Sequence, residues 1–118
     1  MKKVIFYSYQ KCSTCRKASK WLDQNKINYQ FIDIVKQPPS KKFLELALMQ
    51  FSLDVKKIFN SRGKSFKSLD FDVMDLTKNK IIELLSNDGK LIKRPFVIIN
   101  ECKFVLGFNE SEYSANFK

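Results

Sequence analysis

The chain has 118 residues, which is enough for one domain with a hydrophobic core of its own. Apolar residues make up 44% and charged residues 29%, a balance typical of a globular protein, and no apolar run approaches the ~18 residues that a membrane-spanning helix needs. The net charge of +10 comes mostly from lysines scattered along the chain, which favours a solvated surface over a clustered nucleic-acid interface. We therefore expect a single domain over residues 1–118, a monomer, with no membrane and no direct nucleic-acid partner.

The N-terminal segment does not have the pattern of a secretory signal, because the apolar run after Lys2 and Lys3 is short and Cys12 interrupts it. This predicts a cytoplasmic protein, in which cysteines are reduced at rest. The sequence has no histidine, which excludes Cys–His nucleophile pairs and histidine metal ligands. Three cysteines do not complete a four-ligand zinc site in a monomer, so we expect no metal.

The first part of the chain has the pattern of a β-α-β unit. An apolar run predicts a strand over Val4–Ser8, and Cys12 or Ser13 caps a helix that runs to about Gln24. Alternating residues predict a second strand over Tyr29–Ile34. We expect the two strands to be parallel and joined by a right-handed crossover.

The middle of the chain is predicted to be helical. Ser40 is a good N-cap for one helix, and Thr77 for another. We expect a shorter helix from the cap at residues 52–54, a polar loop over 60–65, and a helical turn over 66–69. Residues 87–89 end the second helix, with Gly89 near the C′ position.

The last part of the chain predicts a hairpin and a helix. A buried strand over Phe96–Asn100 turns into a second strand over Cys102–Leu106, and Asn109 starts a helix at about Glu110–Phe117. A β-α-β unit, several helices, then a β-hairpin and a helix together predict an α/β protein of thioredoxin-like fold. Its helical insertion would lie between the two halves, at about residues 40–88.

Two cysteines, Cys12 and Cys15, flank Ser13 and Thr14 at the start of the first predicted helix. The unpaired N–H groups and the dipole at a helix start favour an anion, which lowers a thiol pKa. A C-x-x-C pair beside a β-α-β pattern indicates thioredoxin-like redox chemistry. We predict Cys12 as the nucleophile, Cys15 as the resolving thiol and a Cys12–Cys15 disulfide, with Ser13 and Thr14 as substrate contacts; the alternative is a helix that happens to hold two cysteines.

Two arginines are candidate anion ligands. Arg94 precedes a buried strand, and a cis bond at Pro95 would present backbone groups to a bound thiol or peptide; the alternative is an exposed arginine before an edge-strand proline. Arg62 lies in a polar loop, where its planar fork either reaches an oxyanion or is exposed to solvent. Cys102, far from the C-x-x-C pair in sequence, is expected to be packed and inert rather than a third redox thiol.

Several segments resemble the arsenate reductase-like (ArsC) family, which also contains the Spx regulators, and the resemblance spans essentially the whole chain. It rests on residues 9–18, 37–40, 59–63, 91–95 and 105–108. The resemblance implies a thioredoxin-like fold with an inserted helical subdomain, and redox work at Cys12 with Arg94 beside it. Glutathione-coupled arsenate reductases of this family lack the second cysteine and place three arginines around the oxyanion. Arg94 matches one of these, Arg62 lies in the loop that would offer another, and residues 105–108 contain no arginine.

These observations lead to three hypotheses. The first is a cytosolic, glutaredoxin-like thiol–disulfide oxidoreductase that acts on a small thiol or protein disulfide, with glutathione or another thiol as co-substrate and no bound cofactor. The second is an Spx-like redox-switched transcriptional regulator that binds the RNA polymerase α subunit. The third is an arsenate reductase, which Arg94, Arg62 and the anion-binding helix start would serve.

Overall fold

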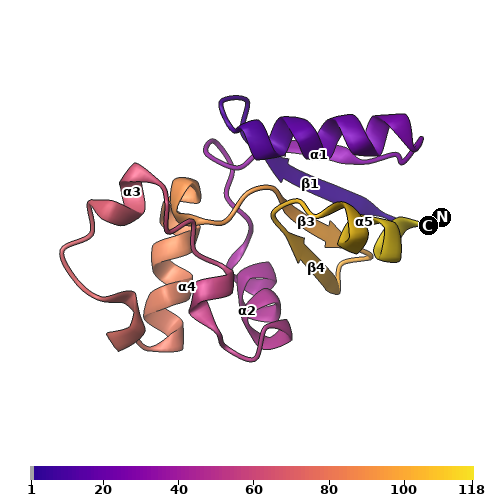
Figure 1. Ribbon diagram of the computed structural model, residues 1–118. Helices are drawn as coiled ribbons and strands as arrows, with labels where there is room; N and C mark the ends of the chain where they lie inside the picture. Colours follow the sequence, from indigo (N-terminus) through magenta and orange to yellow (C-terminus); the bar gives the residue numbers. More distant parts are fainter. Residues whose placement is uncertain (1) are drawn as a thin grey trace.

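A computed structural model describes residues 2–118. In this part of the chain four strands form one mixed sheet, in the order β2–β1–β3–β4 (Figure 1). They are β1 (Val4–Ser8), β2 (Gln30–Asp33), β3 (Phe96–Ile99) and β4 (Lys103–Leu106). Strand β1 pairs in parallel with β2 and antiparallel with β3, which in turn pairs antiparallel with β4. The predicted β-α-β unit, the hairpin and the α/β class are confirmed.

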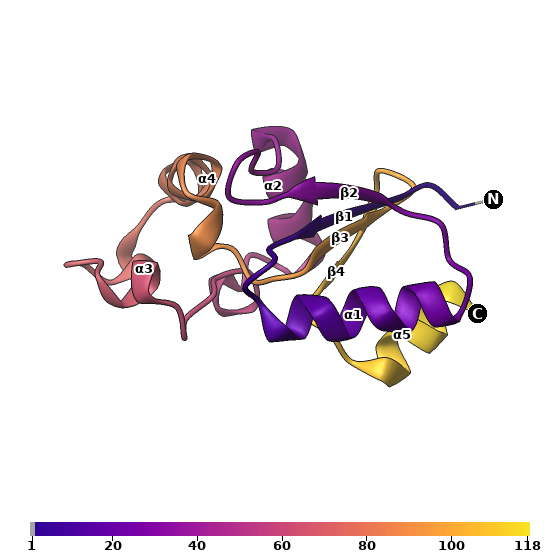
Figure 2. The same cartoon turned by 90° about the horizontal axis from the view of Figure 1, so that it is seen from above.

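Helices cover both faces of this sheet. Seen from above, α1 (Ser13–Gln24) and α5 (Glu110–Phe117) lie on one side, and α2 (Lys41–Gln50) lies on the other (Figure 2). Helix α4 (Lys78–Asn87) packs beside α2. The central strand β1 is therefore buried along its whole length, because both of its faces are covered.

Alternate side chains of β1 enter two different cores. Ile5 and Tyr7 contribute to the core that the sheet shares with α2 and α4. Val4 and Phe6 contribute to the core under α1 and α5. This division follows from the two-residue period of a strand, which sends successive side chains to opposite faces.

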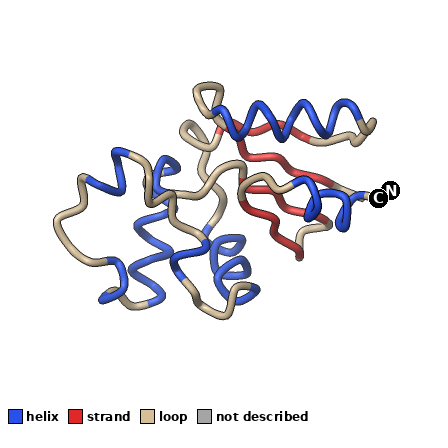
Figure 3. Tube along the Cα trace, viewed as in Figure 1, coloured by secondary structure: helices blue, strands red, loops and turns tan. Residues whose placement is uncertain are grey.

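The chain between β2 and β3 forms a helical insertion, residues 40–88; α2 covers one face of the sheet (Figure 2), and the rest of the insertion lies beyond one end of the sheet (Figure 3). The insertion contains α2, the short α3 (Lys64–Lys67), α4, and 3₁₀ turns at Val55–Lys57 and Val73–Asp75. Its buried residues join the same core as those of the sheet. The insertion is thereby packed against the strands.

Three predicted helix starts are confirmed by their caps. Ser40 Oγ accepts a hydrogen bond from the Phe43 amide, and Thr77 Oγ1 accepts one from the Lys80 amide, both at 3.3 Å. Asn109 Oδ1 accepts one from the Glu112 amide at 3.0 Å. Each bond satisfies an amide that has no partner within the first helical turn.

One detail of the helical insertion differs from the prediction, and one glycine has a packing role that the sequence did not indicate. Helix α3 covers Lys64–Lys67 rather than residues 66–69, because the amide of Lys67 already donates to the carbonyl of Gly63. Gly89 follows the C-cap Asp88 and so occupies the predicted C′ position of α4; it is also buried and begins a 3₁₀ turn over Gly89–Leu91. A Cβ at this position would lie 1.9 Å from the carbonyl oxygen of Ile34, so the glycine permits a close backbone approach.

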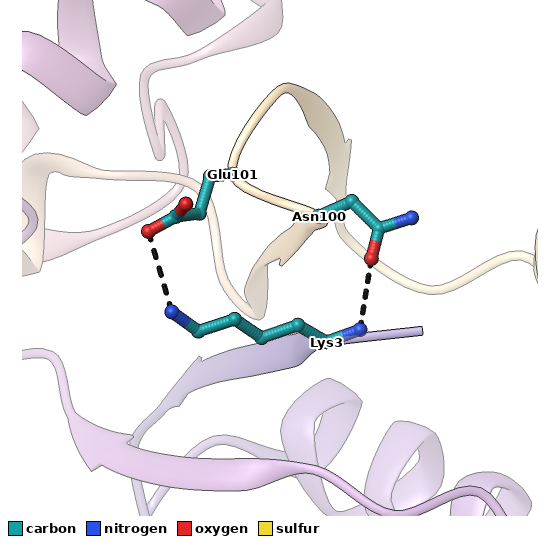
Figure 4. Close-up of polar contacts among 3 residues, drawn as sticks. All are labelled: Lys3, Asn100 and Glu101. Carbon is teal, nitrogen blue, oxygen red and sulfur yellow. Dashed lines mark hydrogen bonds and ion pairs between the residues drawn. The ribbon is translucent and has the colours of Figure 1, made fainter. Parts of the chain in front are cut away.

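The turn of the β3–β4 hairpin is held against the start of β1 (Figure 4). Asn100 and Glu101 have φ values of 52° and 61°, as a tight turn requires. The Lys3 amide donates to Asn100 Oδ1 at 2.9 Å, and Lys3 Nζ lies 3.3 Å from Glu101 Oε1. Cys102 is exposed at this turn. The prediction that Cys102 is packed was therefore wrong, because this residue precedes the buried part of β4.

Across residues 2–118, no helix combines the length and apolar character needed to cross a membrane.

Candidate redox site

Cys12 is the N-cap residue of α1, directly after the turn that follows β1. Its amide donates to the carbonyl of Tyr9 at 3.0 Å, and its Sγ accepts a hydrogen bond from the Cys15 amide at 3.3 Å. A side chain that accepts from the first turn of a helix is the usual feature of an N-cap, and a thiolate fills this role with a full negative charge. The position thus favours the ionised form of Cys12.

The pKa of Cys12 is lowered to about 5. The largest cause is the hydrogen bond that the Cys15 side chain donates to it; the Cys15 amide and the positive charge of Arg94 act in the same direction. Partial burial opposes these effects. At neutral pH the structure therefore holds Cys12 as a thiolate, the form in which a cysteine is nucleophilic.

Cys15, unlike Cys12, is held in its protonated form. It is 1% exposed, and its pKa is raised because its thiol donates to Cys12 and because burial disfavours its charged form. Both residues are free thiols in this structure. The pair thus combines an ionised sulfur at the surface of a cavity with a protonated sulfur buried behind it.

The loop with Arg62 is tied to the segment with Arg94. Phe59 and Ile92 form an isolated antiparallel bridge, with backbone hydrogen bonds of 2.7 and 2.8 Å between the neighbouring residues of the two segments. The bridge connects the helical insertion to the approach to β3. It explains how two arginines far apart in sequence come to border one cavity.

Arg94 interacts with the ring of Tyr9 and lowers the pKa of Cys12. Its guanidinium carbon lies 5.2 Å from the centre of the Tyr9 ring, within the range of a cation–π interaction. Its Nε is buried without a hydrogen-bond partner among the described residues, and none of the ion pairs in residues 2–118 involves it. The peptide bond from Arg94 to Pro95 is cis. The positive charge of Arg94 is therefore available to Cys12 and to an anion in the cavity.

The cavity has a volume of about 800 Å³, within the range of small-molecule sites. Four of the residues singled out from the sequence line it: Cys12, Thr14, Arg62 and Arg94. Ser13, Cys15 and Pro95 are not among its lining residues. Ser13 is exposed, whereas Cys15 and Pro95 are buried. The structure therefore brings together the predicted nucleophile and both predicted anion ligands.

Comparison with known proteins gives the family. Residues 7–116 match the ArsC family. This chain belongs to the ArsC family. The Bacillus subtilis protein YusI is 40% identical to it over 116 residues, which cover 97% of this chain and 98% of YusI. The regulatory protein MgsR of the same organism is 31% identical, with 92% of this chain and 86% of MgsR covered.

A solved structure extends this likeness to three dimensions. The crystal structure of a possible arsenate reductase from Streptococcus mutans superposes on this ArsC-family chain with a TM-score of 0.89 and 35% identity, covering 99% of this chain and 100% of that one. The resemblance inferred from the sequence motifs is thus confirmed at the level of family and fold.

Sequence reasoning did not single out every residue that lines the cavity of this ArsC-family chain. It missed Lys56 and Lys57, because the lysines are scattered and no local pattern separates these two from the rest, and it did not single out Lys93 within the motif at residues 91–95. It also missed the role of Tyr9, for which the only signal was an aromatic residue shortly before the C-x-x-C pair.

Proposed function

We propose that this protein is a thiol–disulfide oxidoreductase in which Cys12 attacks and Cys15 resolves. The observation that carries the proposal is the pairing of an ionised Cys12 at the cavity with a protonated, buried Cys15 that donates to it. Opposite protonation states in adjacent thiols are what a two-step exchange requires, because one sulfur must attack first and the other only afterwards.

The proposed reaction balances as two thiol–disulfide exchanges. The Cys12 thiolate bonds to one sulfur of the substrate disulfide, and the other half leaves as a thiolate that takes a proton from water. Cys15 then loses its proton and attacks Cys12 Sγ, which releases the second half as a thiol and leaves a Cys12–Cys15 disulfide. The substrate gains two electrons, the protein loses two, and an external thiol such as glutathione restores the reduced pair.

A single-turnover experiment tests this scheme. Reduced protein is mixed with a small disulfide, quenched with an alkylating agent and analysed by mass spectrometry, with Cys102→Ser as the background in every variant. We expect a Cys12–Cys15 disulfide in the parent, a stable mixed disulfide on Cys12 in Cys15→Ser, and no reaction in Cys12→Ser. Equal reaction of the parent and Cys12→Ser would falsify the proposal.

A redox-switched binding protein is the second candidate function. It is supported by the similarity to the regulatory protein MgsR and by two apolar side chains exposed on the helical insertion, Leu53 at 54% and Met74 at 56%. Both border a smaller cavity of about 210 Å³. Binding of the purified RNA polymerase α subunit, measured by calorimetry with reduced and oxidised protein, tests it. Absence of binding in both states would exclude this partner.

Arsenate reduction is a third candidate, supported by Arg62 and Arg94 at the cavity and by the likeness to the Streptococcus mutans structure. An assay with arsenate, glutathione and glutaredoxin decides it, since formation of arsenite that depends on Cys12 is the expected result. A rate equal to that of Cys12→Ser would remove this candidate.

A further inference from the structure

The cavity at Cys12 has an uneven distribution of charge. Basic side chains line it from two regions of the fold, and Glu112 is the one carboxylate among its lining residues. Lys93 and Arg94 come from the approach to β3, and Arg94 lowers the pKa of Cys12. A second set, Lys56, Lys57 and Arg62, comes from the helical insertion. None of these five basic residues takes part in the ion pairs found in residues 2–118.

The second set of basic residues supplies more positive charge than the Cys12 thiolate itself requires. The charged group that lowers the pKa of Cys12 is Arg94, which acts together with hydrogen bonds from Cys15. Lys56 and Lys57 follow Asp54, whose carboxylate is engaged as an N-cap acceptor for the Lys56 amide at 3.1 Å. Both lysines line the cavity, and in a concave site the fields of charges of one sign add together and attract anions.

The volume of the cavity limits the size of a ligand that can bind between the two sets of basic residues. A cavity of about 800 Å³ is far larger than a single inorganic oxyanion needs and fits a molecule of small-peptide size. It is open to one nucleophilic sulfur, Cys12, because Cys15 is buried. A ligand that fills it places its own sulfur at Cys12 and extends toward the helical insertion.

We infer that Lys56, Lys57 and Arg62 form an anion subsite, and that the substrate is a small acidic disulfide of peptide size. The half of the substrate that becomes bonded to Cys12 carries at least two carboxylates: one lies at Arg94, and the other reaches the subsite. This inference rests on the proposed oxidoreductase function and specifies its substrate class. The bonds made and broken are those of the two exchanges described above.

Matched disulfides test the subsite. Glutathione disulfide has two carboxylates on each half, and its diester at the glycyl carboxylates keeps the size but removes one of them. Second-order rate constants for oxidation of the reduced protein are measured with both, in the parent, in a Lys56→Ala/Lys57→Ala variant and in a Lys17→Ala/Lys20→Ala variant. The last variant removes the same charge from exposed positions of α1 that do not line the cavity.

We expect the parent to prefer the acid over the ester. Loss of Lys56 and Lys57 should lower the rate constant for the acid by about three- to tenfold, as for two partly screened ion pairs, and reduce the preference over the ester by a similar factor. The Lys17→Ala/Lys20→Ala variant should keep the preference. Equal rates for acid and ester in the parent, or an equal loss for both disulfides in the Lys56→Ala/Lys57→Ala variant, would overturn the inference.

A non-reactive ligand separates this inference from the proposed function. S-methylglutathione has both carboxylates and no free thiol, so its binding can be measured by calorimetry without any redox step. Binding to the parent that weakens in Lys56→Ala/Lys57→Ala supports the subsite even if no disulfide is reduced, in which case the oxidoreductase proposal alone fails. Binding that is unchanged in the variant, or absent from the parent, counts against the subsite even where the exchange reaction proceeds.

Discussion

The thioredoxin-like part of the molecule and the helical insertion supply different chemistry to the same cavity. The thioredoxin-like part provides the sulfur and the groups that ionise it: Cys12, Cys15 and Arg94. The helical insertion provides basic side chains that line the cavity, among them Lys56 and Lys57. The low pKa of Cys12 depends mainly on Cys15, within one helix turn, whereas the basic side chains at the cavity come from distant segments. Under the proposed function, the first would set reactivity and the second would select among substrates.

The two regions are joined by a few specific contacts. The side-chain amide of Gln50, at the end of α2, donates to the Phe104 carbonyl and accepts from the Phe104 amide, both at 2.7 Å. These bonds occupy part of the outer edge of β4, the last strand of the sheet. At Gly89 the chain passes close to the carbonyl of Ile34, at the other side of the insertion. Changes at these contacts test how strongly the cavity depends on the junction.

The largest effect is expected on the pKa of Cys12. In a Cys102→Ser background, the rate of Cys12 alkylation by iodoacetamide should rise with pH around a midpoint of about 5 and then level off, because the thiolate is the reactive form. Cys15→Ala should raise this midpoint more than Arg94→Gln, because the hydrogen bond from Cys15 is the largest cause of the lowered pKa. At pH 6 the Cys15→Ala rate should fall by more than about tenfold, as each pKa unit is a factor of ten in thiolate. A midpoint that is the same in all three proteins would contradict the assignment.

The next effect concerns the junction at Gly89. Gly89→Ala should lower the free energy of unfolding by about 3 kcal/mol, because the added methyl group meets a backbone carbonyl that cannot move away as a side chain could. Urea unfolding followed by circular dichroism measures it. Ser86→Ala, near the end of α4, is the control for a small change nearby. A Gly89→Ala protein as stable as its parent would show that the close approach is relaxed in solution.

A smaller loss is expected at the other junction. Gln50→Leu removes both hydrogen bonds to Phe104 and should cost about 1 kcal/mol, since the edge of β4 remains accessible to water. Met49→Ala, an exposed neighbour on α2, should change stability less. If the Gln50 contact also holds the two walls of the cavity in place, Gln50→Leu will lower the affinity for S-methylglutathione measured by calorimetry; an unchanged affinity would limit its role to stability.

The smallest effect tests Tyr9 as a residue that positions Arg94. Tyr9→Leu removes the aromatic face, with a cation–π energy of about 0.5–2 kcal/mol, and should raise the midpoint of Cys12 alkylation by less than Arg94→Gln does. Tyr9→Phe keeps the ring and should retain the parent profile. An equal shift in Tyr9→Phe and Tyr9→Leu would point to the hydroxyl instead of the ring.

Local patterns predicted most of the fold because the interactions that form it are local. The apolar run at Val4–Ser8 and the caps at Ser40 and Thr77 depend on neighbouring residues, and the strand and helices lie where these signals place them. The exposure of Cys102 and the close approach at Gly89 were not predicted. The first depends on where a hairpin ends relative to the core, and the second on a contact with Ile34, more than fifty residues away.

For the candidate site, the sequence by itself indicated the proposed nucleophile and its proposed resolving partner, because C-x-x-C at a helix start is a motif of adjacent residues. It also indicated the family, through motifs spread along the chain. It also indicated Arg62 and Arg94 as separate candidates. Only the tertiary structure decided that they border one cavity, that Tyr9 lies against Arg94 and that Lys56 and Lys57 face the same space. The physical reason is that a cavity is made of segments that meet through packing and backbone pairing, as Phe59 and Ile92 do, and such long-range contacts leave no periodic signal in the chain.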